Sequence, residues 1–105
     1  MLVSTSDFIP GYSMEVLGLV RGNIVIAKHI GRDIMAGFKN IAGGEIKSYT
    51  DMLNEGRTIS EQRMIAEAEA MGANAIVAMR FASASVLDGT QEVLAYGTAV
   101  KLYAE

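Results

Sequence analysis

The feature that most constrains the fold is the run GANAIVAMRF at residues 72–81, which follows a long stretch rich in Met and Ala. Gly72 suits the position just after a helix, where a positive φ ends the helix at the least conformational cost. From Ala75 to Val86, apolar side chains occupy both alternations, which is typical of a strand covered on both faces. The run therefore predicts a helix stop, a tight turn and a buried strand in direct succession. It contains no catalytic motif.

A long amphipathic helix is predicted over Glu45–Met71, because this segment has no Pro and one internal Gly. At about 100° per residue, small and apolar side chains gather on one face and polar side chains on the other. The first face comprises Ile46, Tyr49, Leu53, Gly56, Ser60, Met64 and Met71, and the second comprises Lys47, Asp51, Glu55, Gln62 and Glu69. The apolar face is expected to lie on a sheet.

Strand patterns precede this helix. Residues 1–4 form a short strand candidate, and the only proline of the chain then marks a turn. From Tyr12 to Val20 the sequence is rich in β-forming residues but is interrupted by Gly18. Arg21-Gly22-Asn23 then breaks or bulges the pattern before Ile24–Ala27 resumes it. The two pieces are expected to form either a hairpin or one long bent strand.

Two further segments complete the expected order of elements. The spacing of apolar residues predicts a short helix over Lys28–Ala42. After the long helix, Asp88-Gly89 predicts a hairpin turn that leads into a last strand at Glu92–Leu102. The order predicts an α+β fold in which an antiparallel sheet carries the long helix across one face.

Composition limits the organisation and the partners of the protein. With 105 residues and no Pro- or Ser-rich linker, the chain is expected to form a single domain, 1–105. Half of its residues are apolar, yet a monomer of this size buries only roughly 60–70% of its unfolded surface. Some apolar surface is therefore expected to lie between copies of the chain. A net charge of -3 weighs against nucleic acid as a partner.

The sequence also bounds chemistry and location. It has no Cys, which removes disulfides, thiolate metal sites and thiol nucleophiles together. It has no basic leader and no apolar run long enough to cross a bilayer, so a cytoplasmic protein without a membrane partner is expected. Catalysis is not expected, because the chain has one His and no Ser in a recognisable nucleophile context.

An ordered set of short motifs along the chain is similar to one family. The motifs are Arg32-Asp33-Ile34, Gly43-Gly44-Glu45, Tyr49-Thr50 with Leu53, Arg63-Met64 with Ala68, Gly72–Val77 with Arg80-Phe81, and Tyr96–Val100. Together they extend over essentially the whole chain, and in this order they resemble the YbjQ-like family of small bacterial proteins. The resemblance implies a small α+β subunit of the dodecin-like β-α-β-β kind, assembled into a homopentameric ring. It also implies a heavy-metal-binding label, without a ligand set that transfers residue by residue.

The best-placed metal ligands are His29, Glu45 and Glu67, contributed by one copy or by several. His29 is the only histidine, so carboxylates or neighbouring copies would have to complete a site that normally uses more nitrogen or sulfur. A ring brings several copies of His29 together, which keeps a divalent metal open as an alternative. The lack of thiolates weighs against a heavy-metal site.

Four residues are candidates for ligand binding or for an interface between copies: Tyr49, Arg63, Glu67 and Arg80. For Arg63 and Glu67, four residues apart near the apolar helix face, an ion pair within the helix or across a subunit boundary is favoured over a ligand or general base. Arg80 either binds an anion or, as is more common, pairs with Glu92 on the facing strand. Tyr49 is interpreted as a buried aromatic with one hydrogen bond.

These observations favour a non-enzymatic, oligomeric binding or scaffold protein whose ligand the sequence does not name. Two alternatives stay open. One is a heavy-metal-binding protein that uses His and carboxylate ligands, and the other is an enzyme with a site between subunits.

Overall fold

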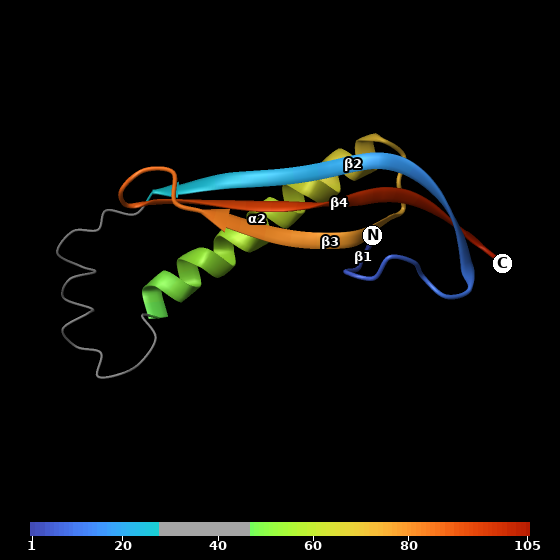
Figure 1. The fold of residues 1–105 in the computed structure, drawn as a ribbon, viewed down its shortest axis with the longest axis horizontal. Coiled ribbons are helices and arrows are strands. Elements are labelled where there is room, and N and C mark those ends of the chain that lie inside the picture. The colour runs from blue at the N-terminus through green and yellow to red at the C-terminus, as the bar shows by residue number, and fades with distance from the viewer. Residues whose placement is uncertain (28–46) are drawn as a thin grey trace.

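The computed structural model describes residues 1–27 and 47–105 (Figure 1). These residues form four strands and one long helix. In chain order they are β1 (Leu2–Val3), β2 (Tyr12–Ala27), α2 (Lys47–Ala70), β3 (Ala75–Ala84) and β4 (Thr90–Ala104). The α+β class is therefore confirmed. The helix expected over Lys28–Ala42 lies outside the described residues, as do His29 and Glu45.

The sheet is mixed, with the strand order β1-β3-β4-β2. β4 is antiparallel to both of its neighbours, as predicted, but β1 runs parallel to β3. The prediction of a wholly antiparallel sheet is therefore wrong. The parallel register pairs Leu2 with Ala75 and Val3 with Ile76, and Ser4 N donates to Ile76 O at 2.9 Å directly after it. A strand of two apolar residues carries no signal for such a direction.

β2 is a single strand of 16 residues that pairs with β4 along its length. Of the two alternatives for this segment, the long strand is correct and the hairpin is not. Its bulge lies between Val16 and Gly18, where the glycine predicts an interruption, and not at Arg21-Gly22-Asn23. Gly18 has a φ of +147°, which residues with a side chain rarely adopt. Gly22 does not interrupt the strand. Its missing side chain leaves room for helix α2.

Gly22 lets helix α2 pack directly on the backbone of β2. A Cβ built on Gly22 would overlap the backbone nitrogen of Met64 and the carbonyl oxygen of Ser60, and would lie 2.7 Å from the Arg63 Cβ. Ser60 is buried, and its Oγ donates to the carbonyl oxygen of Val93 on β4 at 2.8 Å. The middle of the helix is therefore held against the two strands by close contact and by one buried hydrogen bond.

The face predicted to be apolar is the helix face that meets the sheet. Gly56, Ser60, Met64 and Ala68 are buried, and Tyr49 and Leu53 are half-buried. Ala68 takes the place expected of Met71, which is 39% exposed. The predicted polar positions Asp51, Glu55, Gln62 and Glu69 are all exposed. The amphipathic pattern is thus confirmed, with a correction at its last turn.

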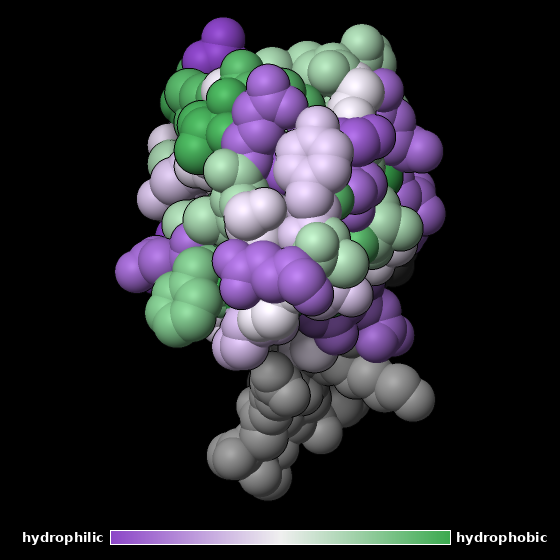
Figure 2. Space-filling model, turned by 90° about the vertical axis from the view of Figure 1, so that its right-hand side faces the viewer, coloured by the Kyte–Doolittle hydropathy of each residue, from purple (hydrophilic) through white to green (hydrophobic). Residues whose placement is uncertain are grey.

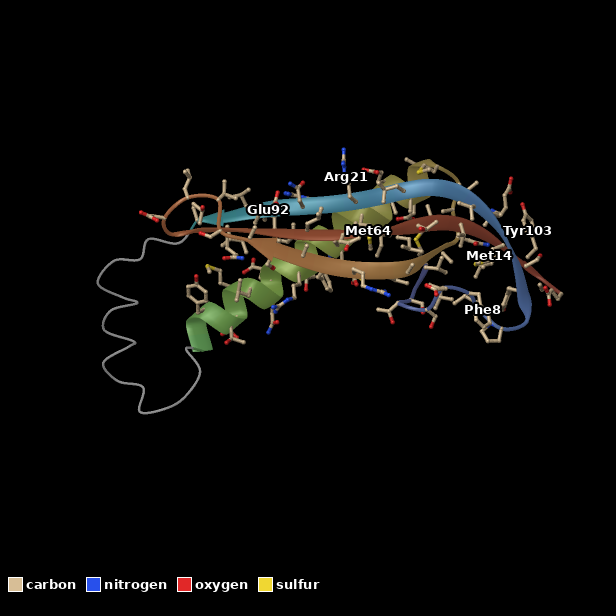
Figure 3. All side chains as sticks on the ribbon, viewed as in Figure 1. Phe8, Met14, Arg21, Met64, Glu92 and Tyr103 are labelled. Carbon is tan, nitrogen blue, oxygen red and sulfur yellow. The ribbon has the colours of Figure 1, made fainter. Side chains whose placement is uncertain are left out.

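The core consists of two clusters on opposite faces of the sheet, because neighbouring strand residues such as Ala75 and Ile76 point to opposite sides. The cluster under α2 comprises Val20, Met64, Ala68, Ile76, Met79, Ala95 and Ala99. The other comprises Ala75, Val77 and Val100, with Ile9, Met14 and Leu102 packed against it. In Figure 3, Met64 lies beside the strands near the middle of the molecule, and Met14 lies nearer the end that carries the C-terminus.

The end of α2 has the geometry predicted for Gly72. Its φ is +83°, Gly72 N donates to Glu69 O at 3.0 Å, and Ala73 N donates to Ala68 O at 3.1 Å. These two bonds form a Schellman motif, in which a left-handed residue lets the last helical turn satisfy its own carbonyls. The chain then enters β3 directly.

Asn74 links this turn to β4. Its Nδ2 donates to the carbonyl oxygen of Leu102 at 3.1 Å, and its Oδ1 accepts from Leu102 N at 2.7 Å. The side-chain amide therefore presents a donor and an acceptor to β4, as the backbone of a paired strand residue would. This explains why an Asn stands between the helix stop and the strand.

The hairpin turn between β3 and β4 forms at the predicted residues. Gly89 has a φ of +77°, and Thr90 N donates to Leu87 O at 2.9 Å. Thr90 Oγ1 also accepts from Leu87 N at 2.7 Å, which tightens the turn. The Asp-Gly signal therefore located this turn correctly.

β3 divides into a covered half and an uncovered half. Residues 75–79 are buried, apart from half-buried Ala78, and residues 80–84 are exposed. The division falls at a bulge, where Ala78, with a φ of +52°, and Met79 lie opposite Gly97. β3 ends at Ala84 rather than Val86. The expectation of burial on both faces holds only for its first half.

We expect Gly22→Ala to lower the free energy of unfolding by roughly 1–3 kcal/mol, because the added methyl group meets helix backbone that cannot move aside. Gly56→Ala is the matched comparison. Its Cβ would meet chiefly the far end of the flexible Ile26 side chain, and Ala favours a helix over Gly by roughly 1 kcal/mol. Urea denaturation measures both variants. An equal loss in the two would contradict the close contact at Gly22.

Gly72→Val is expected to cost on the order of 1–3 kcal/mol, because a β-branched residue is strained in a left-handed conformation. No atom lies within 4 Å of the Cβ position at Gly72, so the cost comes from the backbone and not from a clash. Gly72→Asn is the control, since Asn tolerates positive φ far better. Thermal melts report the difference, and an unchanged melting temperature for Gly72→Val would refute the assignment of this turn.

Candidate functional site

The candidate binding residues do not form one site within a single copy. Tyr49 is half-buried in the first turn of α2, and Arg63 lies 14 residues later, roughly 21 Å along the helix axis. Arg63 contacts β2, whereas Arg80 is on β3, and β4 separates these two strands. The candidates therefore lie in three places: at the start of the helix, in its middle beside β2, and on β3, which is on the other side of β4.

Arg63 joins α2 to β2 at the edge of the sheet. Its Nη1 donates to the carbonyl oxygen of Asn23 at 2.7 Å, a charge-assisted bond to backbone. Glu67, one helical turn later, is exposed. The contact that the structure shows for Arg63 is therefore not the expected ion pair within the helix. It is a bond to a carbonyl of the edge strand.

Arg80 anchors the N-terminal segment to β3. Its Nη1 donates to Thr5 O at 3.0 Å and to Met79 O at 2.8 Å. The expected pairing with Glu92 is wrong, because Arg80 lies opposite Tyr96 on β4 while Glu92 lies opposite Ala84. The guanidinium thus marks the point where the N-terminal segment stops covering the edge of β3.

Glu92 pairs instead with a neighbour on β2. Its Oε2 accepts from Asn23 Nδ2 at 3.2 Å, and both side chains lie on the sheet face away from α2. This contact and the Arg63 bond both involve Asn23. Asn23 is therefore held from its side chain and from its carbonyl.

The described residues contain no group of three or more His, Cys, Asp or Glu side chains that could hold a metal ion. Of the three expected ligands, His29 and Glu45 lie outside the described ranges 1–27 and 47–105. Glu67 is described and exposed. The geometry of the three as a set is therefore not shown.

A small apolar hollow lies between β2 and the first half of α2. Its volume is about 190 Å³, and its lining consists of Ile24, Ile26, Met52, Glu55, Gly56 and Ile59. Sequence patterns did not point to it, although the alternation of Ile24 and Ile26 marks one wall. Ligand pockets usually enclose about 300–1,000 Å³, so this hollow suits only a small apolar group. With one carboxylate and no nucleophile, its lining does not form a catalytic constellation.

Tyr103 donates a hydrogen bond from its hydroxyl to Glu15 Oε1 at 3.2 Å, across β4 and β2. This bond, with smaller effects of desolvation and of the Glu15 charge, raises the pKa of the Tyr103 hydroxyl. Both side chains are exposed. A phenol whose pKa is raised is harder to ionise, so this pair is a structural contact rather than a reactive centre.

Large apolar side chains stay on the surface of a single copy. Leu19 is 65% exposed and Val25 52% exposed on β2, and Phe81 is 43% exposed on β3. Figure 2 shows apolar residues, in green, among hydrophilic ones at one end of the molecule. Phe8, labelled toward that end in Figure 3, is 63% exposed. Exposed apolar side chains of this size are candidates for contact with another molecule.

In the described residues these features define a class: a small α+β protein with one long helix on a mixed sheet and with apolar side chains exposed on its surface. Within the described part of the chain, no helix combines the length and the apolar character that a membrane span requires. These features do not point to a particular reaction. Comparison with known proteins shows the family to which the chain belongs.

The model of the YbjQ family, described as "Putative heavy-metal-binding", matches residues 1–103. A UPF0145 protein of Fervidobacterium nodosum is 58% identical over 97% of this chain and 95% of its own. One of Vibrio parahaemolyticus is 55% identical over 97% of this chain and 98% of its own. A crystal structure from Pediococcus pentosaceus, of a protein with unknown function in the DUF74 family, has a TM-score of 0.64 at 13% identity and covers 98% of both chains. The chain belongs to the YbjQ family.

Proposed function

We propose that the protein works as a non-enzymatic assembly, a closed ring of identical copies that binds a ligand or serves as a scaffold through the surfaces between them. The resemblance to the YbjQ-like family suggests five copies, and we place the ring in the cytoplasm. The observation that carries the proposal is the exposure of Leu19, Val25 and Phe81 in a single copy. Burying a side chain of this size contributes roughly 1.5–3 kcal/mol, before the entropy of association is subtracted.

The positions of the candidate residues support this proposal. Arg63 and Glu67 lie on the helix beside edge strand β2, and Arg80 lies on β3 at the other side of β4. In a ring whose copies meet at these two sides, residues that are separate within one copy come together at the boundary. A binding site built from Arg63, Glu67 and a neighbouring Arg80, with Tyr49 farther along the helix, is then a site between copies.

Native mass spectrometry of protein purified without added metal tests this proposal, because it reports the number of copies and any retained ligand in one measurement. We expect one dominant oligomer of five copies that persists on dilution to low micromolar concentration. Sedimentation velocity on the same sample is the control for gas-phase artefacts. A stable monomer in both measurements would overturn the proposal.

The printed description of the family favours a second candidate, a metal site formed by His29, Glu45 and Glu67 from one copy or several. The chain has one His and no Cys, which is a poor donor set for a soft metal. No feature of the described residues favours the third alternative, an enzyme with a site between subunits. We therefore rank the binding assembly above both.

Titration calorimetry with zinc, nickel and copper separates the first two candidates. We expect weak binding that is the same in the wild type and in His29→Ala, because one imidazole per copy does not make a strong site by itself. Glu69→Gln, at an exposed helix position outside the candidate ligand set, is the matched control. Stoichiometric binding tighter than about 1 μM that disappears in His29→Ala would reverse our ranking.

A further inference from the structure

Within residues 1–27 and 47–105, the two sides of the sheet are open over stretches that lie level with each other. β2 forms one edge, and β3 forms the other beyond the contact of Arg80 with the N-terminal segment. Gly22–Val25 of β2 and Phe81–Ala84 of β3 are paired with the same four residues of β4, Glu92–Ala95. These two stretches are called the β2 edge and the β3 edge below.

Neither edge has the features by which natural edge strands avoid pairing. Its four residues include no charged side chain and no Pro. The bulge of β2 lies elsewhere, between Val16 and Gly18. Arg21, the charged residue next to the β2 edge, points away from the sheet in Figure 3. Strand edges of this kind are ready to pair with another strand.

The β3 edge also shows a conflict between sequence and burial. Its apolar side chains occupy both alternations, as in a strand covered on both faces, yet all four residues are exposed in a single copy. The adjacent half of β3, whose edge is covered by the N-terminal segment, is buried. A strand from outside the copy would remove this conflict.

We infer that the β3 edge of one copy pairs with the β2 edge of the next copy. This inference rests on the proposed ring and specifies its interface. Because the two edges differ, the contact is heterologous, and repeated rotation closes a ring instead of stopping at a dimer. Since both strands are antiparallel to β4, β2 and β3 run in the same direction, and the new pairing is parallel.

The level position of the two edges favours closure over an open filament. A closed ring needs a rotation with little translation along its axis. Strand tilt in a closed sheet displaces the pairing by a few residues, and β2, with 16 residues, has room for this displacement.

One acceptor of the β2 edge is already occupied from outside the sheet. The carbonyl oxygen of Asn23 accepts the 2.7 Å bond from Arg63. The Asn23 carbonyl therefore accepts a hydrogen bond from a group outside β4. A carbonyl oxygen has two lone pairs, so the second one can accept from the N–H of an added strand. The pairing places Arg63 and Glu67 of one copy at the same boundary as Arg80 of the next.

Lysines placed on the edges test the pairing, because charges on an edge strand block strand addition. Ala82→Lys/Ala84→Lys changes the β3 edge, and Val25→Lys changes the β2 edge. All three positions are exposed in one copy, so both variants are expected to fold. Ala66→Lys/Ala70→Lys, at exposed alanines of α2, is the matched control, and Ala82→Glu is a second β3-edge variant of opposite charge.

In native mass spectrometry we expect rings from the wild type and from the α2 control, and folded monomers, by circular dichroism, from every edge variant. An equimolar mixture of Ala82→Lys/Ala84→Lys with Val25→Lys should give a heterodimer and nothing larger, because one intact edge of each kind remains. Rings formed by the edge variants, or a mixture that stays monomeric, would overturn the edge pairing and leave the ring itself standing. A monomeric wild type would instead remove the ring.

Discussion

The close contact between α2 and β2 at Gly22 determines how the rest of the molecule is arranged. The absence of a side chain at this position brings the helix backbone onto the strand, and the buried Ser60 bond to Val93 holds it over β4 as well. An α-helix is about 10 Å wide and neighbouring strands are about 4.8 Å apart, so one helix covers about two strands. The helix that covers β2 and β4 therefore reaches only the first half of β3, through Ile76 and Met79.

The N-terminal segment likewise covers only the first half of β3. It runs along the outer edge of the strand, and backbone bonds from Ala78 and Met79 fix it there. Arg80 ends this contact by binding Thr5 O. Beyond that point neither the helix nor the N-terminal segment covers the strand, which is why exposure rises abruptly within one element whose sequence pattern does not change.

Local signals were sufficient wherever a structure depends on the conformation of a few consecutive residues. Gly72 and Asp88-Gly89 were located correctly because a positive φ is a property of the residue itself. The long helix was also predicted correctly, because its small and apolar residues recur with the helical period. These residues form the face that packs on the sheet. The described helix begins at Lys47 and ends at Ala70, against Glu45–Met71 expected.

Signals failed where the cause lies in a distant part of the chain. A glycine that provides space and a glycine that interrupts a strand look alike in a sequence, so the pattern predicts an interruption at both Gly18 and Gly22, and only the one at Gly18 is correct. The partner of Arg80 was misassigned for the same reason, because the N-terminal carbonyls that bind it cannot be recognised from spacing. For the candidate site, helix periodicity placed Arg63 near the sheet but could not give its distance from Arg80.

The separation of these residues bears on where chemistry can reside in this family. A single copy offers one His, no Cys and, in its described residues, no cluster of ligating side chains. The proposed ring would change this inventory, because rotational symmetry repeats each side chain and would place the two sides of the sheet against each other. Arg63 beside β2 and Arg80 on β3 are too far apart to act together within a copy, yet they lie on the two sides that such a symmetry joins. If the proposed ring forms, a binding site in a protein of this composition would lie at the boundary between copies, together with the apolar side chains that one copy leaves exposed.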